Sequence, residues 1–244
     1  MGGILYFIYK HSEDPLVSVI VFMGIEFFTL SFTALRQMLA ISVVVNSYSF
    51  IKQNKPIKFV LMVLLASLFH KTALVFLLAY LFKYIKINKK TFFIGISSLL
   101  FVQIIGFDLI INILKKFYPY YVPENIMFTT DGIMQCLVIL VYLLFGLYLY
   151  YFQFDKKTKE ENRLLYVIIF AAFVIQSFAN RIPMVNRIMW YFYIFMIIFL
   201  PNQIVNVLDK KLNICFYICI ILVCLLEYII FSINMYDVIP YNFF

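Results

Sequence analysis

The chain has 244 residues, of which 65% are hydrophobic and only 13% are charged. Soluble domains carry about 25% charged residues, so a chain of this composition cannot bury its apolar surface in one water-soluble core. The composition therefore excludes a soluble globular protein and indicates an integral membrane protein. The apolar runs are long and show no sustained alternation with a period of two, which favours an all-α bundle of transmembrane helices over a β-barrel.

The net charge is +8. In a soluble protein this excess would indicate nucleic acid, but here the lysines and arginines lie in short segments between apolar runs, where they set membrane orientation. We therefore assign the charge first to topology and second to an anionic ligand, with no nucleic acid as a partner. The four cysteines show no CxxC spacing and no neighbouring histidine, so we expect small apolar residues in helices and neither a metal site nor a cofactor.

Apolar runs of about 17 to 25 residues predict membrane spans. The first residues, MGGILYFIYKHSEDPL, lack the basic region and cleavage site of a signal peptide and resemble the end of a span that begins earlier. About seven further spans are predicted, over residues 15–31, 37–51, 91–114, 131–153, 164–180, 184–206 and 212–235.

The stretch 57–82 differs from these spans. As one helix it would be about 39 Å long, more than the roughly 30 Å hydrocarbon core. Lysines flank it on both sides, and His70 and Lys71 interrupt its middle. A helical hairpin with its tip at His70 places 14 of the 20 Lys and Arg residues on the cytoplasmic side, whereas a single span places only 11 there and leaves Lys71 in the bilayer. The charges therefore favour the hairpin.

The hairpin topology brings the candidate site residues to the outer face, together with an outer loop over 115–130. Arg36 lies between two apolar runs, as an interface anchor or as a ligand for phosphate or carboxylate, and Gln37 adds a neutral donor and acceptor. His70 either caps carbonyls at a helix break or acts as a general base near the interface. Lys71 follows it at the same tip. The sequence leaves both alternatives open for Arg36 and for His70.

Arg181 and Arg187 bracket Pro183, which ends one helix and begins the next. Two arginines at a helix entry make a plausible anion site, although they also suit an interface. Trp190 and Tyr191 fit an interfacial aromatic belt and need no function, and the tyrosines of Phe117–Tyr121 are a weak signal for sugar stacking. Three acidic residues lie in or near the outer halves of their spans, where each can pair with an arginine: Glu26, Asp108 and Glu227.

Two motifs resemble those of a known family. The run FTALRQMLAISVVVNSYSFIKQNKPIKFVLMVLLASLFHKTALVFLL resembles the EpsG-type family of Wzy-like polysaccharide polymerases, which carry Arg-Gln at the start of one helix and Ala-Ser-x-Phe-His-Lys-[Ser/Thr]-Ala after the next. Here these are Arg36-Gln37 and Ala66–Ala73. The later NRIMWYF, Pro201 and the terminal VIPYNFF are also similar to the family's closing segments. Members usually carry several more N-terminal spans, so the chain resembles an N-terminally truncated member.

The resemblance implies a multi-pass protein of the bacterial plasma membrane. It implies exopolysaccharide or capsule assembly by glycosyl transfer at the outer face, from repeat units on polyprenyl pyrophosphate. The implied partners are that lipid-linked oligosaccharide, membrane lipid and other exopolysaccharide assembly proteins. We expect Arg36, Arg181 and Arg187 to hold the pyrophosphate, Lys71 and Gln37 to bind substrate, and His70 to deprotonate the acceptor hydroxyl. Two rivals are a transporter of lipid-linked sugars and a membrane acyltransferase that modifies sugars.

Overall fold

The computed structural model describes residues 1–101, 103, 112, 116, 132–179, 182 and 185–234, and all regular elements in these residues are helices. The N-terminal helices are α1 (Gly2–His11), α2 (Pro15–Gly24), α3 (Phe27–Thr33), α4 (Leu35–Lys52) and α5 (Pro56–Phe69), followed by the 3₁₀ helix η1 (Lys71–Leu78), α6 (Ala79–Phe82) and α7 (Lys89–Phe101). The C-terminal helices are α9 (Ile133–Phe152), α10 (Lys156–Gln176), α11 (Asn186–Tyr193), α12 (Met196–Val205) and α13 (Lys210–Asn234). The all-α class is confirmed.

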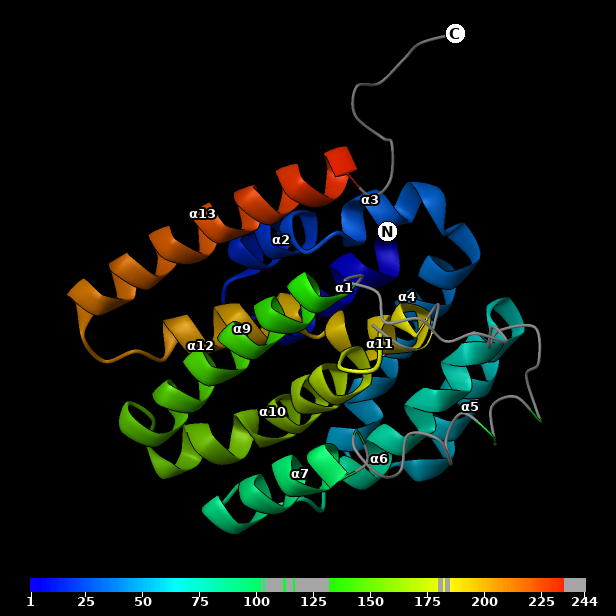
Figure 1. The fold of residues 1–244 in the computed structure, drawn as a ribbon, viewed down its shortest axis with the longest axis horizontal. Helices are drawn as coiled ribbons and strands as arrows, with labels where there is room; N and C mark the ends of the chain where they lie inside the picture. Colours follow the sequence, from blue (N-terminus) through cyan, green and yellow to red (C-terminus); the bar gives the residue numbers. More distant parts are fainter. Residues whose placement is uncertain are drawn as a thin grey trace, which may run out of the picture.

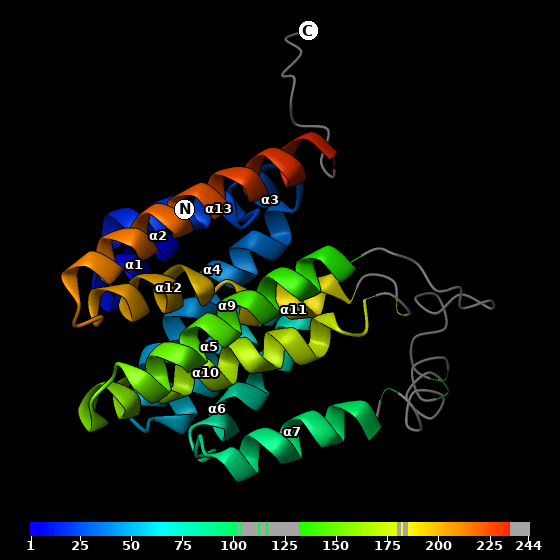
Figure 2. The same cartoon turned by 60° about the vertical axis from the view of Figure 1, so that its left-hand side comes forward.

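Helix α12 forms the centre of the bundle. Its side chains from Met196 to Leu200 are at most 1% exposed. Helices α2 and α13 lie on one side of α12, and α9 and α10 lie on the other, as Figures 1 and 2 show. Gly146 of α9 permits this close packing, because a Cβ at this position would lie 2.5 Å from Cζ of Phe199. The apolar residues thus form one continuous core around α12 and α11.

The count of about seven spans is not confirmed. In the described part of the chain, three helices are long and apolar enough to cross a membrane, over Ile133–Phe152, Asn186–Val205 and Lys210–Ile229. A fourth is possible if α2 and α3, which meet at a 58° bend, form one span. Helix α4 is less apolar because it carries Arg36, Gln37 and Asn46, and α10 begins with two charged turns. Gln37 and Asn46 bond to other segments of the chain, a role that average hydropathy does not reveal.

The chain reverses direction at His70. Helix α5 starts with Pro56 at its first turn and ends at Phe69, where His70 adopts an extended conformation with φ −151° and ψ 115°. The rings of Phe59 and Tyr80, on opposite sides of this turn, lie 5.4 Å apart. Lys83 Nζ also donates a hydrogen bond to Asn54 Oδ1 at 2.8 Å, which joins the two ends of the stretch. Residues 56–82 therefore form two short apolar legs that pack against each other.

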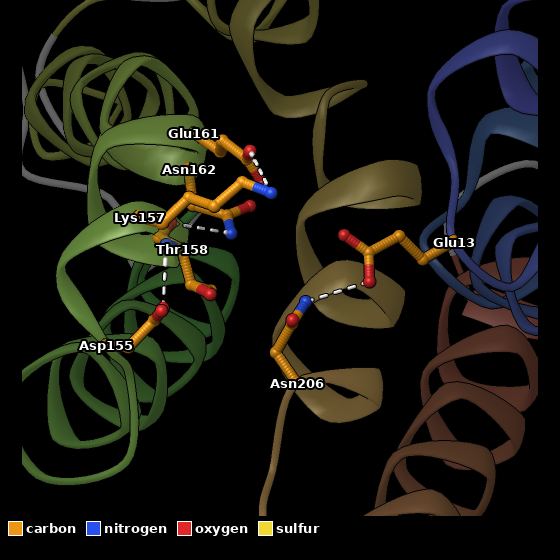
Figure 3. A network of polar contacts seen from close by, with 7 residues as sticks. All are labelled: Glu13, Asp155, Lys157, Thr158, Glu161, Asn162 and Asn206. Atoms are coloured by element: carbon orange, nitrogen blue, oxygen red, sulfur yellow. Dashed lines mark hydrogen bonds and ion pairs between the residues drawn. The ribbon is translucent and has the colours of Figure 1, made fainter.

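Several polar segments that connect the helices meet at one end of the bundle, which we call the lysine-rich end. It comprises residues 10–14, 52–55, 83–88, 152–163 and 206–211. Arg163 Nη1 donates to the carbonyls of Lys83 and Ile85 at 2.7 and 2.8 Å. Figure 3 shows another part of this end, where Asn206 Nδ2 donates to Glu13 Oε2 at 2.8 Å. In the same view Asp155 caps α10 by accepting a hydrogen bond from the Thr158 amide at 2.9 Å. The segments that the sequence analysis places in the cytoplasm are thus close together in space.

Candidate functional site

His70 lies in the turn between α5 and η1. Its amide donates to the carbonyl of Ala66 at 3.2 Å and its carbonyl accepts from the amide of Ala73 at 3.0 Å, so the backbone of His70 closes one helix and opens the next. The imidazole Nδ1 lies 2.6 Å from Thr72 Oγ1, within the same turn. The capping role proposed for this histidine is therefore carried by its backbone, and the ring is held separately by a hydroxyl.

A second hydroxyl reaches the His70 ring from α11. The Tyr191 oxygen lies 3.3 Å from His70 Nδ1 and 3.4 Å from Thr72 Oγ1. Among the residues that the structure describes, the hydrogen bonds of the ring all involve Nδ1. The other ring nitrogen, Nε2, forms no hydrogen bond with these residues, and the side chain is half-buried.

Arg187 is an exposed residue one helical turn before Tyr191 on α11, so the two side chains share a face. Partial burial of His70 lowers the pKa of its imidazole, and the positive charge of Arg187 lowers the pKa further. Both causes favour the neutral ring at pH 7, which is the form that accepts a proton.

Gln37 connects α4 to the same place. Its side chain is 3% exposed, and Nε2 donates to the carbonyl of Arg187 at 2.6 Å. Gln37 therefore fixes the first turn of α11, the turn that carries Arg187. The structure thus brings together three of the predicted residues, His70, Gln37 and Arg187, from three separate segments.

The other predicted residues are less closely tied to this cluster. Arg36 and Lys71 neighbour Gln37 and His70 in the chain, and both are exposed. Arg181 lies outside the described residues, as do Asp108 and, apart from Lys116, the loop predicted over 115–130.

A model of the EpsG family matches residues 1–243 of the chain. This chain belongs to the EpsG family. EpsG is a family of the Wzy-like polymerase type, and membership assigns the chain a polymerase-like role in exopolysaccharide assembly at a membrane. Neither a curated protein nor a solved structure matches the chain.

In this EpsG family member, Thr72 and Tyr191 contact His70 in the candidate site, and sequence reasoning missed both. Thr72 stands two positions after His70, a spacing at which a hydroxyl can reach a side chain in the same turn. The prediction that Tyr191 and Trp190 belong to an interfacial belt is wrong, because the two side chains are 0% and 9% exposed. The i,i+4 relation of Tyr191 to Arg187 is the signal from which Tyr191 could have been found.

Two of the predicted acidic residues, Glu26 and Glu227, are buried in the EpsG bundle. Glu26 is 3% exposed and lies at the break between α2 and α3 with φ 68°. Its Oε1 accepts hydrogen bonds from Gln135 Nε2 and, at 3.1 Å, from Trp190 Nε1. Glu227 is 4% exposed and accepts from the Tyr142 hydroxyl at 2.8 Å. Gln135, Trp190 and Tyr142 are thus neutral donors that bind these two carboxyl groups within the core.

Proposed function

We propose that this chain is a membrane polysaccharide polymerase. It joins repeat units carried on polyprenyl pyrophosphate by glycosyl transfer at the outer face of the bacterial plasma membrane, in exopolysaccharide or capsule biosynthesis. Family membership supports the polymerase-like role. The observation that carries the mechanism is the position of His70, whose Nδ1 contacts Thr72 and Tyr191 and whose pKa is lowered by partial burial and by the charge of Arg187.

In the proposed reaction, an acceptor sugar hydroxyl attacks the anomeric carbon of the donor. The new carbon–oxygen bond forms as the bond from that carbon to the pyrophosphate oxygen breaks, and the hydroxyl proton passes to His70 Nε2. The hydrogen bonds at Nδ1 orient the ring for this transfer. General base catalysis of this kind contributes about 10²- to 10⁴-fold in rate.

The leaving pyrophosphate carries the negative charge that develops in the transition state. Arg187, with Arg36, Arg181 and Lys71, supplies positive charge to stabilise it. Arginine suits this task because its planar fork matches phosphate oxygens and its charge persists at all physiological pH values. Gln37 acts through Arg187, because its amide holds the carbonyl of that residue and with it the start of α11.

Complementation of a polymer-deficient strain tests the proposal. We expect His70→Ala and Arg187→Ala to abolish high-molecular-weight polymer while the protein remains in the membrane at normal abundance. His11→Gln is the matched control, because His11 is the chain's other histidine and lies at the lysine-rich end, where its Nε2 is 2.8 Å from Ser49 Oγ. Normal polymer from both site variants would remove the proposed site.

A further inference from the structure

An apolar groove lies between α7, α9 and α10. It has a volume of about 280 Å³, close to the lower end of the range of small-molecule sites, about 300 Å³. Its walls are formed by Ile94 and Gly95 of α7, Leu143 and Leu147 of α9, and Val167 and Phe170 of α10. Thr91 and Tyr166 also line the groove, but their hydroxyls already donate within the protein, Thr91 to the carbonyl of Lys86 and Tyr166 to the carbonyl of Gly146. The walls therefore suit a hydrocarbon chain.

Gly95 keeps the groove open on the α7 side. A Cβ at this position would lie 3.1 Å from Cζ of Phe170, closer than ordinary van der Waals contact. A larger side chain would therefore fill the space between α7 and α10. Residue 95 thus offers a direct way to block the groove.

The groove opens toward cationic side chains. Lys86 lines it, and Lys90 in the first turn of α7 is exposed. Neither lysine forms an ion pair with another described residue. Arg163 fixes the rim through its hydrogen bonds to the carbonyls of Lys83 and Ile85. The mouth therefore presents the positive charge of Lys86, which no described residue pairs, on a braced segment.

The groove lies within the thickness of one membrane leaflet. Leu147 and Leu143 precede the end of α9 at Phe152 by about 8 and 14 Å along the helix, within the roughly 15 Å of one hydrocarbon leaflet. Phe152 belongs to the lysine-rich end, which the positive-inside rule places in the cytoplasm. Helix α4 separates this end from the His70 site, because the 12 steps from Gln37 to Ser49 span about 18 Å.

We propose that this groove binds one acyl chain of an anionic phospholipid from the inner leaflet, with the lipid phosphate against Lys86. Apolar walls take the chain, and the lysine at the mouth selects the headgroup, as in other basic pockets between membrane helices on the cytoplasmic side. The polyprenyl tail of the substrate is a less suitable occupant because its pyrophosphate must reach the opposite end of the bundle.

Quenching of a tryptophan by brominated lipids tests this site. The natural Trp190 is buried, and Leu147 lines the groove in a half-buried position. A Leu147→Trp variant of the full chain therefore reports the groove against a weak background. In vesicles that mix brominated phosphatidylglycerol or brominated phosphatidylcholine with unlabelled lipid, we expect the anionic lipid to be preferred about fivefold, the effect of one lysine near the phosphate. Adding Lys86→Gln should bring the preference close to one, whereas Lys210→Gln, an exposed lysine on α13, should leave it unchanged.

Four results would overturn the proposal. They are equal quenching by both headgroups, no quenching by either lipid, unchanged preference in Lys86→Gln, and displacement of brominated phosphatidylglycerol by polyprenyl phosphate at lower concentration than by phosphatidylglycerol. The last result would assign the groove to the substrate's tail. When Gly95→Leu is added to the Leu147→Trp variant and the thermal unfolding temperature is retained, quenching of the introduced tryptophan by either lipid should fall. Undiminished quenching in that double variant would likewise contradict the proposed position of the chain.

Discussion

Replacing Thr72 with valine tests how His70 is held. Valine keeps the shape of threonine but removes Oγ1, the atom 2.6 Å from His70 Nδ1. A hydrogen bond of this kind contributes about 0.5–1.5 kcal/mol, and its short length favours the upper half of that range. Since 1.4 kcal/mol corresponds to a factor of about ten, we expect the rate of polymerisation to fall about 5- to 13-fold.

The expected losses follow an order that the geometry sets. Tyr191→Phe removes only the long, weak hydrogen bonds of 3.3 and 3.4 Å and should cost less than about fivefold. His70→Ala removes the base and should cost about 10²- to 10⁴-fold. The measurement is the initial rate of polymer formation by purified protein in liposomes, with kcat and KM determined separately, because a ring that is wrongly oriented lowers kcat more than it raises KM.

Thr72→Ser is the control for this series. Serine retains the hydroxyl and should restore most of the rate that valine loses. A Thr72→Val protein with the rate of the wild type would refute the claim that this hydroxyl orients the ring. A valine variant as inactive as His70→Ala would refute the assignment of His70 as the sole base and make Thr72 part of the chemistry.

Three further predictions follow from the same geometry. Because the charge of Arg187 lowers the pKa of His70, Arg187→Gln should raise that pKa and move the acidic limb of the pH–rate profile to higher pH. Arg187→Lys should leave the limb in place, and an unmoved limb in the glutamine variant would contradict the electrostatic coupling. Gly146→Ala should lower the free energy of unfolding in detergent by about 1–3 kcal/mol, since its Cβ would lie 2.5 Å from Phe199. Gly2→Ala, whose Cβ would have nothing within 4 Å, should leave that free energy unchanged. Equal melting temperatures of the two variants would argue against the packing of α9 on α12. A His70→Cys variant in a background that lacks the four native cysteines should react with a membrane-impermeant thiol reagent added outside the cell, and reaction only from the cytoplasm would reverse the topology.

The break at His70 was predictable because charge and length both mark it. Lysines flank residues 57–82 on both sides, and one helix of that length exceeds the bilayer core. The number of spans was less predictable. Helix α4 carries polar residues such as Gln37 and Asn46 that bond to other segments, Gln37 to Arg187 and Asn46 to the carbonyl of Gly3. Such tertiary hydrogen bonds cannot be inferred from the hydropathy of one helix.

The candidate site was predictable only in part. His70, Gln37 and Arg187 stand out as polar residues beside apolar runs, and they lie together in the structure. Tyr191 did not stand out, because a tyrosine near a span end suits the membrane interface equally well. Its burial depends on the packing of α11 against η1, which is a property of the assembled bundle.

Reconstitution with a defined substrate tests the central claim most directly. The protein is placed in liposomes with repeat units on polyprenyl pyrophosphate, and both polymer length and released polyprenyl pyrophosphate are measured. We predict that the two products appear together in wild-type and His11→Gln proteins and fall at least about 100-fold in His70→Ala. Transport of the lipid-linked repeat unit across the membrane without release of polyprenyl pyrophosphate, or full polymerisation by His70→Ala, would contradict the proposed function or its mechanism, respectively.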